Sequence, residues 1–139
     1  MADTFQLEVA TPERLFVDEQ VSWVELPGKE GYMGVLAGHA PLLSILGAGV
    51  LTYTSGGSDE VLALDGGFVE VLGDHVRVLA DHAEFARDIS IDAARRQLEE
   101  ANNALNNAHE PHDSAAALRA INQAQARLDA AERSTGRPA

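Results

Sequence analysis

An abrupt change of residue type near position 89 constrains this chain more than any other feature. Every valine lies in the first 78 residues, and every glycine but one lies in the first 73. Beyond residue 92, alanine dominates and Ile121 is the single β-branched apolar residue. Valine and glycine together favour strands and turns, whereas alanine-rich segments favour helix. We therefore predict two units, an all-β unit over residues 1–88 and an α-helical unit over residues 89–139.

The first unit consists of short apolar runs separated by turn signals. Residues 5–9 alternate apolar and polar side chains, which is the pattern of a half-buried strand. The Gly73-Asp74 pair separates two further runs by two residues, as in a tight hairpin, and residues 65–67 are interpreted as another turn. The other strand candidates are residues 21–26, 49–54, 61–64, 68–72 and 75–79. Many short strands without a helical window between them predict an antiparallel sandwich or flattened barrel.

The second unit carries two narrow apolar stripes at helical spacing. Ser90 is predicted to cap a helix over residues 91–108, and Pro111 is predicted to end it. Asp113 is predicted to cap a second helix over residues 114–133. Because a short turn joins the two helices, we expect an antiparallel hairpin. Its seam is mostly alanine, which buries little apolar area, so the hairpin should be held weakly.

Composition excludes several classes of function. The net charge is −12, with −11 in residues 1–88, and such a balance repels the phosphates of nucleic acids. The chain has no cysteine, which excludes disulfides, thiolate catalysis and cysteine-ligated metals. No signal peptide is visible and no apolar run approaches the roughly 20 residues that span a bilayer. We therefore expect an intracellular protein that could sit on a membrane complex without inserting.

Candidate chemistry in the sequence is sparse. The five histidines lack the spacing of a helical zinc site, and His39, held between Gly38 and Pro41, is interpreted as a loop anchor or a partner contact. The scattered carboxylates are interpreted as a solvated acidic face. No nucleophile elbow, phosphate loop or dinucleotide fingerprint is present. These patterns favour a non-catalytic protein. A free-standing sandwich that binds a small ligand is the alternative, although Trp23 is the sole tryptophan, and an enzyme ranks third.

Two stretches resemble a known family. Residues 30–43 (EGYMGVLAGHAPLL) look like the signature of the epsilon subunit of F-type ATP synthases. Residues 64–71 (LDGGFVEV) and 76–81 (VRVLAD) are similar to the same family. The Gly-His-Ala-Pro-Leu element is the most specific part of the match, and the order of a β unit before a helical hairpin agrees over the whole chain.

The resemblance implies a non-catalytic rotor protein of the central stalk. In that family the sandwich contacts the gamma subunit and the ring of c subunits, and it helps couple proton flow to ATP synthesis. Residues 30–43 are expected to form a loop at one end of the sandwich. Within them, Glu30, Tyr32, Met33 and His39 are the predicted rotor contacts. The implied location is the cytoplasmic face of a bacterial plasma membrane, peripherally bound, with a thylakoid membrane as the alternative.

The helical hairpin is the regulatory part in that family. Folded down it permits turnover, and extended it enters the alpha/beta catalytic head and blocks ATP hydrolysis. Residues 114–139 carry a local net charge of +2. Arg119 and Arg127 are therefore predicted to contact an acidic element of the head when the arm extends.

Some members of the family bind ATP on the folded hairpin, and part of their motif is present. Ile91, Asp92 and Arg95 match it, and Arg127 falls where a second-helix arginine is expected. The departures from the motif are Arg96, Asn102 and Gln123. Each lost cationic donor weakens a triphosphate site by about 1.5–3 kcal/mol. We therefore expect at most a weak regulatory ATP site, and no other cofactor and no metal.

Overall fold

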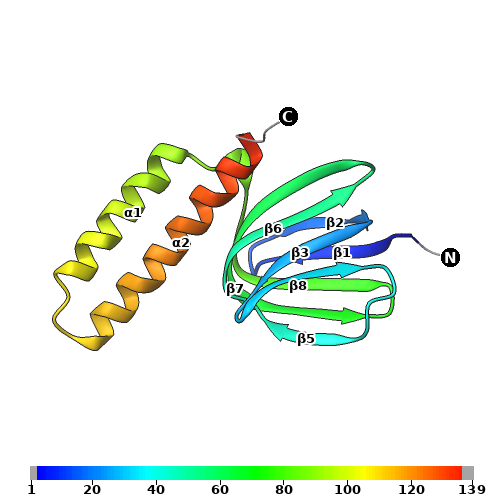
Figure 1. Cartoon of the computed structure of the whole chain (residues 1–139), viewed down its shortest axis with the longest axis horizontal. Coiled ribbons are helices and arrows are strands. Elements are labelled where there is room, and N and C mark those ends of the chain that lie inside the picture. The colour runs from blue at the N-terminus through cyan, green and yellow to red at the C-terminus, as the bar shows by residue number, and fades with distance from the viewer. Residues whose placement is uncertain (1–2, 136–139) are drawn as a thin grey trace.

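The computed structural model describes residues 3–135 of the chain, with the strands preceding the helices (Figure 1). The strands are β1 (Phe5–Ala10), β2 (Leu15–Val21), β3 (Trp23–Gly28), β4 (Gly31–Leu36), β5 (Leu42–Ile45), β6 (Ala48–Ser55), β7 (Ser58–Leu72) and β8 (His75–Phe85). A short 3₁₀ turn, η1 (Ala86–Asp88), leads into α1 (Ile91–Asn106) and α2 (Pro111–Thr135). The predicted fold class, an all-β sandwich followed by an α-helical hairpin, is confirmed.

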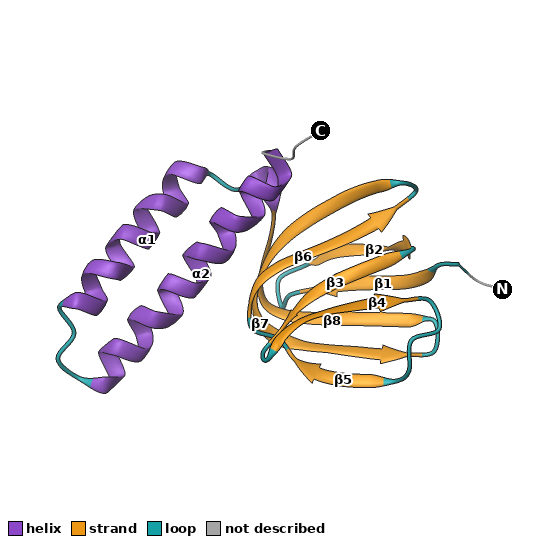
Figure 2. Ribbon diagram, in the orientation of Figure 1, coloured by secondary structure: helices purple, strands orange, loops and turns teal. Residues whose placement is uncertain are grey.

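The strands form one continuous sheet that folds over on itself into two layers (Figure 2). The order is β2-β1-β8-β7-β6-β3-β4, and β5 pairs with the second half of β7. Most neighbours are antiparallel, but β1 and β8 run parallel, from Gln6 opposite His75 to Ala10 opposite Leu79. The predicted antiparallel sandwich therefore contains one parallel pair, because the chain returns to its first strand only after passing through the other layer.

Strand β7 is the element that joins the two layers. Its first half pairs with β6 and its second half with β5, while β8 follows it on the other side. Gly66 and Gly67 lie at the bend with φ angles of 73° and 108°. A Cβ atom on Gly67 would lie 2.0 Å from the Leu79 carbonyl oxygen, so no side chain fits there. The interpretation of residues 65–67 as a turn is wrong, because these glycines bend one continuous strand.

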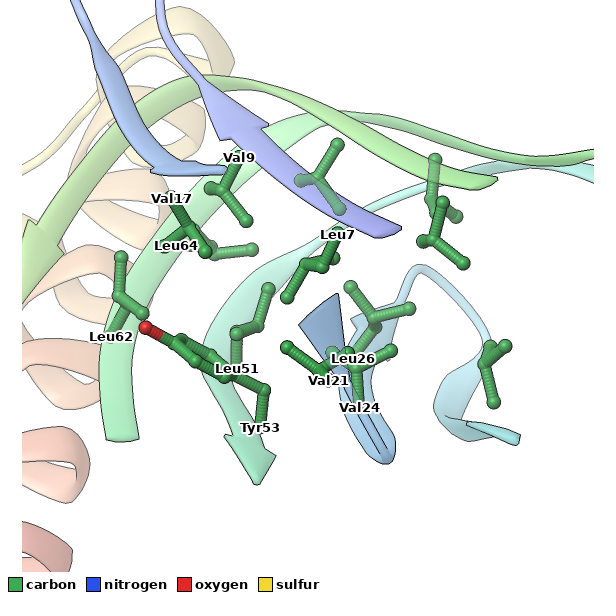
Figure 3. Packing of buried hydrophobic residues seen from close by; sticks show 14 of the residues in the cluster. Leu7, Val9, Val17, Val21, Val24, Leu26, Leu51, Tyr53, Leu62 and Leu64 are labelled. Carbon is green, nitrogen blue, oxygen red and sulfur yellow. The ribbon is translucent and has the colours of Figure 1, made fainter. Parts of the chain in front are cut away.

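Alternating apolar side chains fill the space between the layers (Figure 3). Leu7 and Val9 of β1, Leu51 of β6 and Leu62 of β7 have no exposed surface. Burying each such side chain contributes about 1.5–3 kcal/mol relative to leaving it in water. The sandwich core is therefore dense and should hold the positions of the outward-facing residues firmly.

Residues 30–43 contain two strands that the sequence did not indicate. Strand β4 pairs with β3 along its whole length and forms one edge of the sheet, and β5 pairs with β7. Within this stretch, Glu30 lies in the β3–β4 turn and residues 37–41 form the connecting loop between β4 and β5. The expectation of a loop over residues 30–43 is therefore wrong, because its glycines tolerate extended pairing as well as turns.

The helical hairpin begins where expected, but its turn is built differently. The Ser90 hydroxyl accepts the Ala93 N–H at 3.2 Å, which confirms the predicted cap. Helix α1 ends at Asn106, and Pro111 opens α2 and does not terminate α1. Proline suits the first turn of a helix because the N–H it lacks has no partner there anyway. Residues 136–139, part of the positively charged segment, lie outside the described residues.

Helix α2 lies between α1 and the sandwich (Figure 1). A second apolar cluster forms where it meets the outer face of β6 and β7, and it includes Val50, Val61 and Ala63 from the strands. Leu128 and Ala130 cover these residues from α2, and Leu128 is 7% exposed. The hairpin therefore docks through α2, whose small side chains allow close approach on two sides.

Candidate functional site

The four predicted rotor contacts do not lie together. Glu30, Tyr32 and Met33 line a shallow groove of about 530 Å³ at the β3–β4 turn, together with residues of β5. His39 lines a different groove, of about 520 Å³, beside the β7–β8 turn. Since His39 follows the end of β4 and Glu30 precedes its start, the length of that strand separates the two places.

Tyr32 makes a structural contact in addition to being exposed. Its side chain is 53% exposed, yet its hydroxyl accepts the buried Val50 N–H at 2.9 Å. The pairing of β3 with β6 stops at Glu25 opposite Thr52, so Val50 has no ladder partner on β3. The Tyr32 hydroxyl takes the place of that acceptor and ties β4 to β6 across β3.

Met33 and His39 are also engaged within the chain. Met33 is partly buried and packs against the sandwich core. The His39 Nδ1 atom lies 2.7 Å from the Ala40 carbonyl oxygen, and its backbone N–H donates to the Leu36 carbonyl at 3.2 Å. Gly38, with φ at 83°, provides the turn between them. These contacts fix the ring of His39 on its own loop and leave it only half-buried.

An exposed apolar row on the outer face of β5, β7 and β8 is the main feature that the sequence reasoning missed. Ile45 lies opposite Phe68, and Phe68 lies opposite Leu79, so the three side chains cross three strands side by side. They are 61%, 43% and 38% exposed, and Leu43 next to them on β5 is 70% exposed. Large apolar side chains gathered on one face mark a surface that binds another molecule.

The sequence contains a signal for this row. Phe68 and Leu79 alternate with valines such as Val69 and Val78, which are fully buried. Both faces of these strands are therefore apolar. A sheet with one face in solvent usually carries polar side chains on that face. A continuous apolar run is ambiguous without the strand register, and the register places Phe68 and Leu79 outward.

A row of charged residues lies beside the apolar row on the same face. Arg77 of β8 is opposite Glu70 of β7 and Glu8 of β1, and its guanidinium is 3.2 Å from the Glu8 carboxylate. His75 Nε2 lies 2.6 Å from the same Glu8 oxygen. The hydrogen bond from His75, supported by Arg77, lowers the pKa of Glu8. The face therefore combines exposed apolar groups with charges that are already compensated.

Arg127 stands at the centre of a polar network on the hairpin. Its Nε donates to Glu84 Oε1 at 2.9 Å and its Nη2 to Glu84 Oε2 at 3.4 Å, a two-pronged contact with β8. Its Nη1 donates to Gln97 Oε1 on α1 at 3.0 Å. Gln97 in turn donates to Gln123 of α2 at 3.3 Å. One guanidinium therefore connects β8, α1 and α2.

The end of α2 is tied to the sandwich separately. Arg133 Nη1 donates to the buried Thr52 hydroxyl at 3.1 Å and lies 3.6 Å from a Glu25 oxygen. Arg119, the other predicted arm residue, is exposed on α2. The two predicted arm residues therefore differ in the folded hairpin, since Arg127 is held inside a network and Arg119 faces solvent.

The residues of the partial nucleotide motif are not gathered in one cavity. A groove of about 500 Å³ between the hairpin and β8 is lined by Arg127 with Glu84 and Gln97, but not by Ile91, Asp92 or Arg95. Ile91 packs against the apolar cluster, while Asp92 and Arg95 are exposed on the first turns of α1.

Comparison with known proteins decides which family this architecture represents. Residues 4–86 match the family model of the β-sandwich domain of the ATP synthase delta/epsilon chain. The ATP synthase epsilon chain of Solibacter usitatus is 52% identical over 96% of this chain and 99% of its own length. The chain belongs to the ATP synthase epsilon chain family. The epsilon chain of Carboxydothermus hydrogenoformans is 45% identical over 76% of this chain and 78% of its own length.

Solved structures show the same fold as this epsilon-family chain. A chain in the Euglena gracilis mitochondrial ATP synthase, a structure of its OSCP, F1 and c-ring, matches with a TM-score of 0.83. The match covers 94% of this chain and 82% of that chain at 24% identity. A chain in the central stalk and c-ring of the Tetrahymena thermophila enzyme matches with a TM-score of 0.67 at 12% identity, covering 91% and 95% of the two chains.

Residues 3–135 of this epsilon-family chain contain neither a membrane-spanning helix nor a metal-binding cluster. In that part of the chain no helix is both long and apolar enough to cross a membrane. The same residues hold no cluster of three or more side chains suited to binding a metal ion.

Proposed function

We propose that this chain is a non-catalytic rotor subunit in the central stalk of an F-type ATP synthase. It binds the gamma subunit and the c ring and helps couple proton flow through the ring to ATP synthesis in the catalytic head. It works at the cytoplasmic face of a bacterial plasma membrane as a peripheral component. Membership of the epsilon family and the central-stalk assemblies in which the structural neighbours occur support this assignment.

The exposed row of Ile45, Phe68 and Leu79 is the observation that carries the proposal. These side chains project from a densely packed sandwich, so they form a stiff apolar surface suited to a permanent neighbour in the stalk. In the adjacent row, Arg77 lies within ion-pair distance of both Glu8 and Glu70, and these ion pairs lower the cost of covering the row. We assign this face to the gamma subunit. The groove that contains Glu30 and Tyr32 adjoins this face, since Ile45 also lines it, and it is assigned to the c ring.

The test replaces Phe68 and Ile45 together by serine and measures binding to a purified gamma–c-ring subcomplex. Leu118→Ser on α2 is the matched control, because Leu118 is also a large apolar residue at 49% exposure. The double variant should bind at least about tenfold more weakly, since hot-spot side chains contribute more than 1 kcal/mol each. The Leu118→Ser chain should bind like the parent. Equal affinity of the folded double variant would overturn the proposal.

The predicted contacts at the two ends of β4 are tested by binding to the gamma subunit and to the c ring presented separately. His39→Ala should weaken binding to the stalk without unfolding the sandwich, because the ring is half-buried and bonds only to its own loop. Glu30→Gln removes an exposed charge from the other groove and should weaken binding to the c ring alone. Unchanged affinity of folded His39→Ala for both partners would remove that loop from the rotor interface.

The hairpin is proposed to act as an inhibitory arm of the same subunit. At 1.5 Å per residue, α1 and α2 span about 24 Å and about 37 Å, so end to end they reach on the order of 60 Å. Docking through one helix and a small apolar cluster leaves the arm releasable. Extended, it would present Arg119 and Arg127 to the catalytic head and block ATP hydrolysis. In the folded state Arg127 is engaged by Glu84, so its contact with the head requires release first.

A weak regulatory ATP site on the folded hairpin is the remaining part of the proposal. Arg127 is the motif arginine that lines the groove between the hairpin and β8, and a phosphate would have to displace the Glu84 carboxylate from it. Titration calorimetry with ATP on the isolated chain tests the site. We expect weak binding in the parent that Asp92→Ala and Arg95→Ala abolish, and unchanged binding in these variants would refute the assignment.

A further inference from the structure

Release of the hairpin requires two interfaces to separate. One joins α2 to the sandwich, where Val50, Val61 and Ala63 meet Leu128 and Ala130. The other joins α1 to α2 along a seam of small residues, in which Ala94 and Ala124 are fully buried. Apolar contact acts locally in each interface. The α2–sandwich cluster also includes α1 side chains between residues 91 and 98, so only along the rest of the seam would the apolar contacts alone let the two interfaces open independently.

Arg127 is located where these interfaces meet. Its guanidinium donates three hydrogen bonds. Two go to Glu84 across the sandwich interface and one goes to Gln97 across the hairpin seam. The Arg127 and Glu84 side chains are 23% and 35% exposed, so the contact is partly shielded from water. Gln97 extends the network to Gln123, which adds a second hydrogen bond across the same seam. Hydrogen bonds linked in this way reinforce one another.

We infer that Arg127 couples the two interfaces, so that undocking of α2 and opening of the hairpin take place as one step. If α2 leaves the sandwich, Arg127 loses both bonds to Glu84 and its bond to Gln97 becomes exposed to water, where it adds little. If α1 leaves α2, Gln97 no longer orients the guanidinium and the ion pair with Glu84 weakens. Undocking of α2 and opening of the hairpin therefore each lower the free energy needed for the other.

Two other arginines of α2 supply matched comparisons. Arg133 contacts Thr52 and Glu25 of the sandwich, so it clamps α2 at one interface. Arg119 is exposed on the same helix, so its replacement makes the same chemical change away from both interfaces. If the coupling belongs to Arg127, Arg133→Gln should weaken docking without separating the two events, and Arg119→Gln should change neither.

The experiment follows both distances in the full chain, which has no native cysteine to interfere with labelling. Cysteines introduced at the exposed positions Ser58 and Asn122 carry a dye pair that reports the distance between α2 and the sandwich. In a second labelled chain, cysteines at Asn103 and Asn122 carry a dye pair that reports the distance between α1 and α2. Energy transfer is measured across a urea titration, and Trp23 fluorescence reports the sandwich itself. Both hairpin transitions should precede that of the sandwich.

In the parent, the two distances should change at one urea midpoint. In Arg127→Gln the midpoints should fall and differ from each other by at least about 0.5 M. Gln97→Ala removes the α1 side of the network and should also separate them, while leaving the α2–sandwich midpoint closer to that of the parent. Separate midpoints in the parent, or coincident midpoints in Arg127→Gln, would overturn the inference.

The inference relies on the proposed inhibitory role for its physiological meaning, since a coupled release makes an arm switch between two states without a half-open form. The measurement uses the isolated chain and reads distances only. A null result in an ATP hydrolysis assay would therefore refute the proposed inhibition and leave the coupling intact. Uncoupled transitions in the labelled chain would refute the coupling and leave the inhibitory role intact.

Discussion

Removal of the Tyr32 hydroxyl offers a sharp test of how the edge strand β4 is held. Tyr32→Phe deletes one oxygen, the acceptor of the Val50 N–H at 2.9 Å, and keeps the aromatic ring. Val50 is 1% exposed, and it lacks a ladder partner on β3. The variant therefore leaves a buried donor without its acceptor and creates no cavity in the core.

The expected cost is the desolvation of one unsatisfied backbone group, about 1–3 kcal/mol. Tyr32 itself is 53% exposed, so water can reach part of the vacated space, and the lower half of that range applies. A loss of about 1–2 kcal/mol corresponds to a fall in Tm of roughly 3–10 °C for a chain of this size. Urea unfolding followed by Trp23 fluorescence measures it.

Tyr53→Phe is the matched control, since it also removes one tyrosine hydroxyl. The Tyr53 hydroxyl donates to Glu19 at 3.1 Å, and burial raises the pKa of Tyr53 above its usual range. Glu19 is an exposed carboxylate that water can satisfy, so this variant should lose less stability. Amide exchange at Val50 should quicken in Tyr32→Phe alone. Stability within about 0.3 kcal/mol of the parent, with Val50 still protected, would refute the reasoning.

Three further predictions concern the bend, the charged row and the hairpin. Gly67→Ala should destabilise the chain by more than about 3 kcal/mol in urea unfolding, because its Cβ would meet the Leu79 carbonyl at 2.0 Å. Gly57→Ala, also at positive φ but with open space around it, should cost only about 1 kcal/mol, and equal losses would contradict the close approach at the bend. Since His75 and Arg77 lower the pKa of Glu8, the ionised carboxylate stabilises the fold above the unfolded pKa of about 4.3, and this contribution is lost as pH falls through the lower folded value. Glu8→Gln should therefore be less stable than the parent at pH 7 and nearly equal to it at pH 2, and a difference that persists in acid would refute this cause. A chain ending at Asp88 should fold with reduced stability, because Val50 and Val61 lose their cover, and should raise ATP hydrolysis by the reconstituted complex. Hydrolysis that stays unchanged at low and high ATP would argue against the inhibitory arm.

Local sequence properties were enough to establish the fold class, an all-β unit followed by a helical hairpin. Valine with glycine before residue 89 and alanine after it separate strands from helices, because backbone preferences act over a few residues. The Ser90 cap could be predicted for the same reason, since its hydroxyl needs only the N–H of Ala93 three residues later. The motifs of residues 30–43 and 64–71 led to the family, which the comparisons confirmed.

The local sequence pattern gave wrong predictions where the same residues fit two different structures. Gly66 and Gly67 have positive φ, as glycines in a turn do, yet β8 continues past them and makes them a bend within β7. By local pattern Pro111 suits the end of α1, but proline is equally suited to open α2, which it does here. In both cases the deciding information lies in the neighbouring element.

The candidate functional surfaces depended on tertiary structure for a related reason. The exposed apolar row exists because the strand register places Phe68 beside Ile45 and Leu79. A shift of one residue would turn these side chains to the buried face. Arg127 and Glu84 are 43 residues apart, and nothing in either segment indicates that they meet. Composition and short motifs determined the kinds of elements and the family, because these depend on neighbours along the chain. Which side chains face outward, and which arginine joins three elements, were decided by packing between segments far apart in sequence.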